Sequence, residues 1–325
     1  MKVAITGAAG HLGAALLQEL CKRNIAVKAF VRDDDRSCKN LPVEIIKGDI
    51  MNPVALQSLM QGCDAVIHCA ALISVNGDPH GLVQLTNVEG TRLVIDNALK
   101  ASIKRFLHIS SIHAFQQKPS FEILNENSKA TDEKGFAYDR SKQAGQQIAL
   151  AANENGMEVL VLNPTSIVGP FDFKPSLVGK VIIDLYKGKL PFIFNGGFDF
   201  CDCRDVANAI VNSLTKGKAG ETYLLGGKWH SLKQLAEILE KVSDKKIKIM
   251  ALPEWAAYAG LPFVKLFAAL QKKEPLYTVE GLEALFHGNH CISSAKAMNV
   301  LNYSTRPFEE TVTDTFQWFR NNNYL

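Results

Sequence analysis

The chain has 325 residues, of which 47% are hydrophobic and 21% charged, and it carries a formal net charge of +3. These values are typical of a globular protein of about two domains, and so mild a charge argues against nucleic acid or an anionic membrane as a partner. The seven cysteines are odd in number and lie mostly in apolar runs, so we expect reduced core residues of a cytoplasmic protein.

The first predicted element is a buried strand at residues 2–6, which breaks into the turn Gly7-Ala8-Ala9-Gly10-His11-Leu12-Gly13. Gly7 permits the sharp exit from the strand, Gly10 lets the backbone approach a phosphate, and Gly13 lets the next helix pack closely on the sheet. The N-terminus of that amphipathic helix directs unpaired N–H groups at an anion. Strand, turn and helix together predict a dinucleotide site. Its three glycines follow one another at intervals of three positions.

Strand and helix patterns alternate through the first half of the chain. Strands are predicted at 26–31, 43–47, 65–69, 105–110 and 158–163, and helices at 80–101 and 136–155. Continuous apolar strands between helices predict an α/β fold, a doubly wound parallel sheet of the Rossmann type that binds ligands at the carboxyl ends of its strands. We assign residues 1–165 to a dinucleotide-binding domain, and residues 166–325 mainly to a smaller substrate-binding lobe that partly returns to the sheet. Helices are expected there at 204–214 and 232–242.

Neither a targeting segment, nor a membrane span, nor a metal site is expected. The chain opens directly with a strand, which argues against a secretory signal peptide. The apolar stretch 255–270 is shorter than a span of about 20 residues, so we expect it to cover the substrate pocket or an interface. Cys201-Asp202-Cys203 lacks a second cysteine pair, and His287, His290 and Cys291 lack an evident fourth ligand.

Three polar residues indicate acid–base chemistry on a carbonyl or alcohol. Ser111 closes the strand at 105–110, and Tyr138 and Lys142 lie one helical turn apart on the same face of a predicted helix. A lysine ammonium near a phenol favours the phenolate, so we expect a lowered pKa for Tyr138. Tyr138 then acts as proton donor or base, Ser111 binds the same substrate oxygen, and Lys142 reaches the ribose hydroxyls of the cofactor.

These motifs, in their order and spacing, resemble the extended short-chain dehydrogenase/reductases. The likeness is strongest to the dihydroflavonol-4-reductase-like branch of the NAD(P)-dependent epimerase/dehydratase group, and it covers almost the whole chain. The matching motifs are the 6–13 turn, Gly48-Asp49-Ile50, His68-Cys69-Ala70-Ala71, Asn87-Val88-Glu89-Gly90-Thr91, Ser110-Ser111, Tyr138 with Lys142, Asn163-Pro164, Val168-Gly169-Pro170 and Arg204-Asp205-Val206-Ala207.

The resemblance implies a set of cofactor-binding and substrate-binding residues. Cofactor contacts are implied for Gly7, Ala9, Gly10, His11, Leu12, Gly13, Arg32, Asp49, Ile50, Cys69, Ala70, Ala71, Asn87, Tyr138, Lys142, Pro164, Thr165, Ile167 and Val168. Substrate contacts are implied for Ser111, His113, Asn163 and Phe171. Asn87 is expected to brace the site through its amide, and the family suggests a homodimer. Without the resemblance, a role as a cap before a helix would be as good an interpretation of Asp49 as a cofactor contact. His113 would then be interpreted as a histidine in a loop.

Three functions are compatible with these residues. The first is an oxidoreductase that passes hydride between a nicotinamide and a carbonyl or alcohol carbon of a small, apolar or aromatic substrate. The second is a nucleotide-sugar epimerase or dehydratase, and the third a non-catalytic dinucleotide sensor, which turnover of any carbonyl compound would exclude. A sensor has no use for Ser111, Tyr138 and Lys142 together. Nucleotide-sugar relatives typically place an arginine before the Asp199-Phe200 step, where this chain has Phe198. Asn163 favours the sugar alternative, because sugar-active relatives often bind substrate there.

The cofactor prediction rests on the end of the strand at 26–31. An acidic residue there indicates NAD, whereas this chain has Arg32, with Lys39 on the next loop. A guanidinium can pair with a 2′-phosphate and stack on adenine, so we expect NADP to be preferred, with NAD possible. Asp33-Asp34-Asp35 oppose this by neutralising Arg32 or repelling the phosphate. The alternative is that Arg32 is a solvated turn residue paired to one of them.

Overall fold

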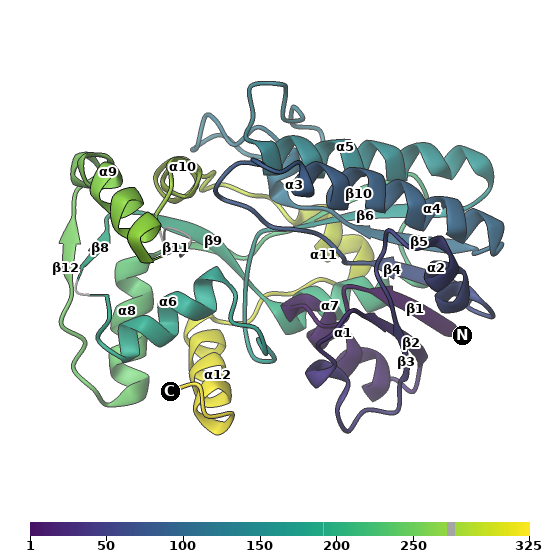
Figure 1. Ribbon diagram of the computed structural model, residues 1–325, viewed down its shortest axis with the longest axis horizontal. Coiled ribbons are helices and arrows are strands. Elements are labelled where there is room, and N and C mark those ends of the chain that lie inside the picture. Colours follow the sequence, from purple (N-terminus) through teal and green to yellow (C-terminus); the bar gives the residue numbers. More distant parts are fainter. Residues whose placement is uncertain (191, 272–276) are drawn as a thin grey trace.

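A seven-stranded, all-parallel sheet forms the body of the computed structural model, which describes residues 1–190, 192–271 and 277–325 (Figure 1). Its strand order is β10-β6-β5-β4-β1-β2-β3, so the order reverses between β1 and β4, as in a doubly wound fold. The strands are β1 (Lys2–Thr6), β2 (Ala26–Val31), β3 (Glu44–Lys47), β4 (Ala65–His68), β5 (Arg105–Ile109), β6 (Glu158–Pro164) and β10 (Thr222–Leu225). The predicted Rossmann architecture is confirmed.

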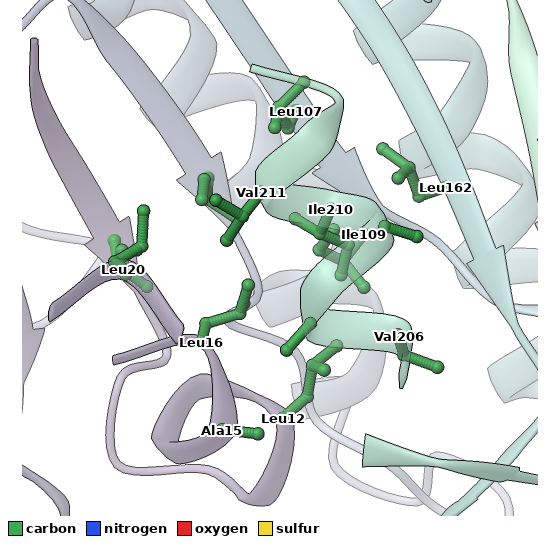
Figure 2. Close-up of a cluster of buried hydrophobic side chains, with 14 of the residues drawn as sticks. Leu12, Ala15, Leu16, Leu20, Leu107, Ile109, Leu162, Val206, Ile210 and Val211 are labelled. Carbon is green, nitrogen blue, oxygen red and sulfur yellow. The ribbon is translucent and has the colours of Figure 1, made fainter. Parts of the chain in front are cut away.

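Helices cover both faces of this sheet because its strands bury alternate side chains on opposite sides. On one face lie α1 (His11–Lys22), α7 (Cys203–Asn212) and α11 (Ala295–Leu301). Figure 2 shows side chains of α1 and α7 gathered with those of β5, among them Leu16, Ile210 and Ile109. On the other face lie α2 (Pro53–Met60), α4 (Gly90–Lys100) and α5 (Ala137–Ala151), around a second core.

The predicted helix at 80–101 is not one regular helix. It consists of α3 (Leu82–Gln84), a π-helical turn (Leu85–Glu89) and α4. The hydroxyl of Thr91 donates to the carbonyl oxygen of Asn87 at 2.7 Å, which satisfies a backbone acceptor within the widened turn. Turns of this kind are frequent at functional sites, and this one carries Asn87.

The second half of the chain builds a smaller lobe with its own apolar core, and it returns to the large sheet through β10. A three-stranded sheet holds β7 (Ser166–Val168), β9 (Gly197–Asp202) and β11 (Lys228–Ser231), and a two-stranded sheet holds β8 (Phe192–Phe194) and β12 (Met250–Leu252). Its helices are α6 (Leu177–Tyr186), α8 (Leu232–Ser243), α9 (Glu254–Gln271), α10 (Val279–His287) and α12 (Phe308–Asn321). Among the described helices, none combines the length and apolar character needed to cross a bilayer.

Candidate active site

The glycine-rich turn after β1 is tightly packed on its inner side and open on its outer side. Gly7 has a φ of +72°, and a Cβ there would lie 2.6 Å from the backbone nitrogen of Ala70. A Cβ on Gly13 would lie 2.2 Å from the carbonyl oxygen of Gly7. Gly10 is exposed, and none of the described side chains caps the helix α1 that starts after it. The turn therefore fits a dinucleotide, whose pyrophosphate the free N–H groups of the helix start would bind.

His11 connects this turn to the second half of the chain. Its Nε2 lies 3.1 Å from the carbonyl oxygen of Gly169 and 3.0 Å from that of Pro170. Carbonyl oxygens only accept, so Nε2 carries a proton. The resemblance implied a cofactor contact for His11, and the structure adds this link between the start of α1 and the segment after β7.

Ser111 and Tyr138 come together at the carboxyl end of β5. Ser111 follows that strand directly, and its Oγ accepts from the backbone N–H of His113 at 3.3 Å. Tyr138 lies in the first turn of α5. Burial raises the pKa of Tyr138 to about 12, and the neighbouring Ser111 side chain opposes that rise. Tyr138 is therefore a protonated phenol at neutral pH, which is the form that donates a proton to a carbonyl oxygen.

Lys142 lies one turn further along α5, but it does not act on Tyr138 as expected. Its Nζ is buried and donates to the carbonyl oxygen of Ile109 at 2.8 Å. Burial also lowers the pKa of Lys142 to about 8. The prediction that Lys142 lowers the pKa of Tyr138 is wrong for this structure, because loss of solvation outweighs any charge effect on the phenol.

Asn87 is buried, and its side chain links two segments of the chain. Asn87 accepts from the backbone N–H of Leu72 at 2.7 Å, and its Nδ2 donates to the carbonyl oxygen of Leu72 and to Oγ of Ser141 at 3.0 and 2.9 Å. It thus joins the segment after β4 to α5.

Asn163, implied to contact substrate, lies fully buried behind Ser111. Its Nδ2 donates to the carbonyl oxygen of Ser111 and to Oε1 of Gln146, each at 2.8 Å. The side chain is buried and its Oδ1 has no hydrogen-bond partner among the described residues, so the implied substrate contact of Asn163 stays a prediction.

A chain of hydrogen bonds that the sequence did not reveal runs beneath the site. Oγ1 of Thr6 lies 2.7 Å from Nδ1 of His68, and Nε2 of His68 lies 3.0 Å from Oγ1 of Thr91. Because the Thr91 hydroxyl donates to Asn87, His68 donates from Nε2 and accepts at Nδ1. Burial lowers the pKa of His68 to about 3, so the ring stays neutral. The only sequence signal was the position of His68 within the His68–Ala71 motif.

The remaining implied cofactor residues line the carboxyl edge of the sheet, and their surroundings differ. Arg32 is exposed at the end of β2, and its guanidinium lies 3.9 Å from Asp49. Asp49 also accepts from the backbone N–H of Met51 at 2.9 Å, so it stabilises the approach to α2. After β4, Cys69 and Ala70 are half-buried and Ala71 is exposed. At the end of β6 and in β7, Pro164, Thr165 and Val168 are buried and Ile167 is half-buried.

Ile50 and Phe171, two of the implied residues, pack against apolar side chains. Ile50 is buried, and a Cβ on Gly90 would lie 2.6 Å from its Cδ1. Phe171, implied to contact substrate, has a φ of +70° and packs against the core between the sheet and α1. A φ in this region is uncommon for a bulky residue.

Fold and family together define an NAD(P)-dependent enzyme of the extended short-chain dehydrogenase/reductase type. The chain belongs to the NAD dependent epimerase/dehydratase family, whose model matches residues 3–226. It is 30% identical to sterol demethylase protein B of Methylococcus capsulatus, with 98% of each chain covered. It is 28% identical to a putative dihydroflavonol 4-reductase of Synechocystis, over 99% of this chain and 95% of that one.

Solved structures share the fold over the whole chain. The crystal structure of gox2253 superposes with a TM-score of 0.86 at 28% identity, covering 100% of this chain and 99% of that one. A UDP-glucuronic acid 4-epimerase from Bacillus cereus, in complex with UDP-glucuronic acid and NAD, has a TM-score of 0.78 at 21% identity, with 99% of each chain covered. At that identity the likeness concerns the fold alone. The curated relatives include reductases and also a sugar-active enzyme, a dTDP-glucose 4,6-dehydratase of Actinoplanes that is 26% identical over 74% of each chain.

Proposed function

We propose that the protein is an oxidoreductase that transfers hydride between a nicotinamide and a carbonyl or alcohol carbon of a small, apolar or aromatic substrate. The observation that carries this proposal is the pairing of Ser111 with a protonated Tyr138 at the carboxyl end of β5. The names of two relatives support an apolar substrate, because sterols and dihydroflavonols are ring compounds with large apolar surfaces.

The chain's own residues would act on the substrate oxygen. Bound nicotinamide supplies or accepts the hydride. The hydroxyls of Ser111 and Tyr138 would hold the carbonyl oxygen, and Tyr138 would deliver the proton as negative charge develops there. Asn163 donates to the backbone carbonyl oxygen of Ser111, and Asn87 donates to Ser141 on α5. These hydrogen bonds would hold in place the backbone segments that carry both hydroxyls.

Two features disfavour a nucleotide sugar as substrate. Phe198 occupies the place where sugar-active relatives carry an arginine, and its ring packs against Phe200 with centroids 5.8 Å apart. An apolar ring offers no partner to a diphosphate. Asn163, the residue that favoured a sugar substrate, is buried and engaged with Ser111 and Gln146.

NADP is the preferred cofactor in this proposal, with NAD as a possible second. Asp34 pairs with Arg36 at 2.6 Å and Asp35 with Lys47 at 3.7 Å, so these two acids have other partners than Arg32. The Arg32–Asp49 pair is long and exposed, and pairs of that kind contribute little stability. Arg32 therefore remains available to a 2′-phosphate.

The test is a comparison of two substrate panels on the purified protein. We expect NADPH oxidation with apolar and aromatic ketones and aldehydes, and no conversion of UDP- or dTDP-sugars. Conversion of a nucleotide sugar without net consumption of cofactor would support the epimerase alternative. Cofactor binding without turnover of either panel would support a sensor.

A further inference from the structure

The helix α9 carries apolar side chains on the face that it turns away from the protein. Of its described side chains, Ala257 and Leu261 are buried in the core of the smaller lobe. Trp255, Ala259 and Pro262 lie on the opposite face and are exposed, Trp255 to 72%. A surface helix normally exposes charged and polar residues on its outward face. Exposed apolar surface of this kind marks a site of interaction.

The strand before this helix extends the exposed apolar surface. Met250, at the start of β12, is 65% exposed, and its partner in β8 is Phe192, which is 39% exposed. Paired residues of neighbouring strands point to the same side of a sheet, so these two side chains lie next to each other. The segment from α8 to β12 and the start of α9 lie at one end of the molecule, on the left in Figure 1. We call Phe192, Met250, Trp255, Ala259 and Pro262 the apolar tip.

Two lysines lie just before the apolar tip in the chain. Lys246, Lys248 and Met250 are exposed, whereas Ile247 and Ile249 between them pack against the core of the smaller lobe. Alternate residues of an extended segment point to the same side, so both ammonium groups lie on the side of Met250. The tip therefore combines apolar side chains with positive charge.

The region around the tip is basic although the charge of the whole chain is small. Lys189, before β8, and Lys245 are exposed as well. Asp244 and Glu254 flank the lysine segment, and Glu254 already pairs with His287 at 3.1 Å. The net charge of +3, which argues against an anionic membrane as a partner, averages over all 325 residues and hides this basic end.

We propose that the apolar tip docks on the surface of a membrane that contains anionic phospholipids. Trp255 and Met250 would enter the boundary between headgroups and acyl chains, where indole rings are favoured, and the lysines would pair with lipid phosphates. A second copy of the chain is disfavoured as the partner, because a two-fold interface would bring the lysines of both copies together. The docking does not depend on the proposed reaction. It would hold the enzyme where substrates with large apolar surfaces accumulate.

The experiment measures how much of the purified protein sediments with lipid vesicles. One set of vesicles contains equal amounts of phosphatidylglycerol and phosphatidylcholine, and the other contains phosphatidylcholine alone. We expect the protein to bind the anionic vesicles far more tightly, and added salt to weaken this binding. Trp255→Ser should weaken it about tenfold, because less apolar surface leaves water. Lys246→Gln combined with Lys248→Gln should weaken it about thirtyfold, at about fivefold for each lysine.

Two controls match these variants. Phe121→Ser removes an aromatic ring that is 75% exposed on the loop before α5, outside the apolar tip. Lys100→Gln combined with Lys104→Gln removes two exposed charges at the end of α4 and just after it. Both controls should bind the anionic vesicles as the wild type does, and urea denaturation shows whether each variant is folded.

Three results would overturn the inference. The first is a wild type that does not sediment with anionic vesicles, and the second is an equal loss of binding in the test variants and their controls. The third is self-association without vesicle binding that Trp255→Ser abolishes, which would identify a second copy as the partner. None of these results affects the proposed reductase function, which is measured without vesicles.

Discussion

At the scale of single residues, Tyr138 and Lys142 illustrate how burial overrides a sequence rule. Their spacing predicts a lysine that acidifies a phenol, yet burial moves the pKa of Tyr138 up to about 12 and that of Lys142 down to about 8. In both cases the neutral form is favoured, because each side chain is removed from water. Spacing along a helix reveals neighbours but not their solvation.

Tyr138→Phe removes the proposed proton donor and keeps the ring. General acid catalysis contributes roughly 10²–10⁴-fold, so turnover of ketones should fall by at least about a hundredfold. The cofactor should still bind, which a fluorescence titration with NADPH measures. Ser111→Ala should lose less, because the proton source remains. Near-normal turnover in Tyr138→Phe would rule out this residue as the acid.

Arg32→Ala tests the cofactor preference. A charge-assisted contact contributes about 1.5–3 kcal/mol, so the wild type should bind NADPH roughly ten- to a hundredfold more tightly than NADH. The variant should lose most of this preference and keep its affinity for NADH, as calorimetric titration of both cofactors would show. Arg36→Ala is the matched control, since Arg36 is occupied by Asp34. Equal binding of both cofactors by the wild type would contradict the assignment.

At the scale of elements, the regular strands follow from the sequence and the irregular segments do not. The predicted strand at 26–31 coincides with β2, and the predicted helix at 136–155 covers α5 and the 3₁₀ turn after it. The π-helical turn at 85–89 was missed because apolar periodicity records which face is buried and not the pitch of one turn. The bracing partners of Asn163 were missed because one of them lies 52 residues away along the chain.

Asn87→Ala tests the brace that the π-helical turn supplies. The substitution leaves the buried Oγ of Ser141 without the N–H group from which it accepts, and a buried polar group without its partner costs about 1–3 kcal/mol. We expect weaker cofactor binding together with a lower free energy of unfolding, measured by urea denaturation. Asn97→Ala is the control, because Asn97 is also buried and its Nδ2 donates to the carbonyl oxygen of Leu93 in its own helix. Equal effects of both substitutions on cofactor affinity would refute the bracing role.

At the scale of the whole molecule, links between distant segments hold the site together. The ring of His11 joins the start of α1 to Gly169 and Pro170, and the hydroxyl of Thr278 before α10 donates to the carbonyl oxygen of Val75. Such links between distant segments follow from tertiary packing, so the sequence showed the two halves of the chain but not how they join.

Lys142 also makes the stability of the cofactor-free protein depend on pH. Its pKa is about 8 in the folded protein and lies below its ordinary value of 10.5. Between these values the unfolded chain binds the proton more strongly, so this residue makes the free energy of unfolding rise with pH. The rise is about 2 kcal/mol between about pH 7.5 and 9.5.

Lys142→Met should remove that contribution. Urea denaturation of both proteins at the two pH values gives the difference directly, since buried cysteines such as Cys201 and Cys203, which act in the opposite direction, are common to both. Parallel pH profiles for the wild type and Lys142→Met would show that Lys142 keeps its ordinary pKa in the folded protein.

The most direct measurement of the central claim follows the hydride itself. The wild type is incubated with NADPH that carries deuterium at both C4 positions of the nicotinamide and with a ketone that the panel selects, and the product is analysed by mass spectrometry and NMR. The proposed function predicts one deuterium on the former carbonyl carbon of the alcohol, with one NADPH oxidised for each alcohol formed. An alcohol without deuterium, or a substrate converted while the cofactor stays bound and undergoes no net oxidation, would contradict it.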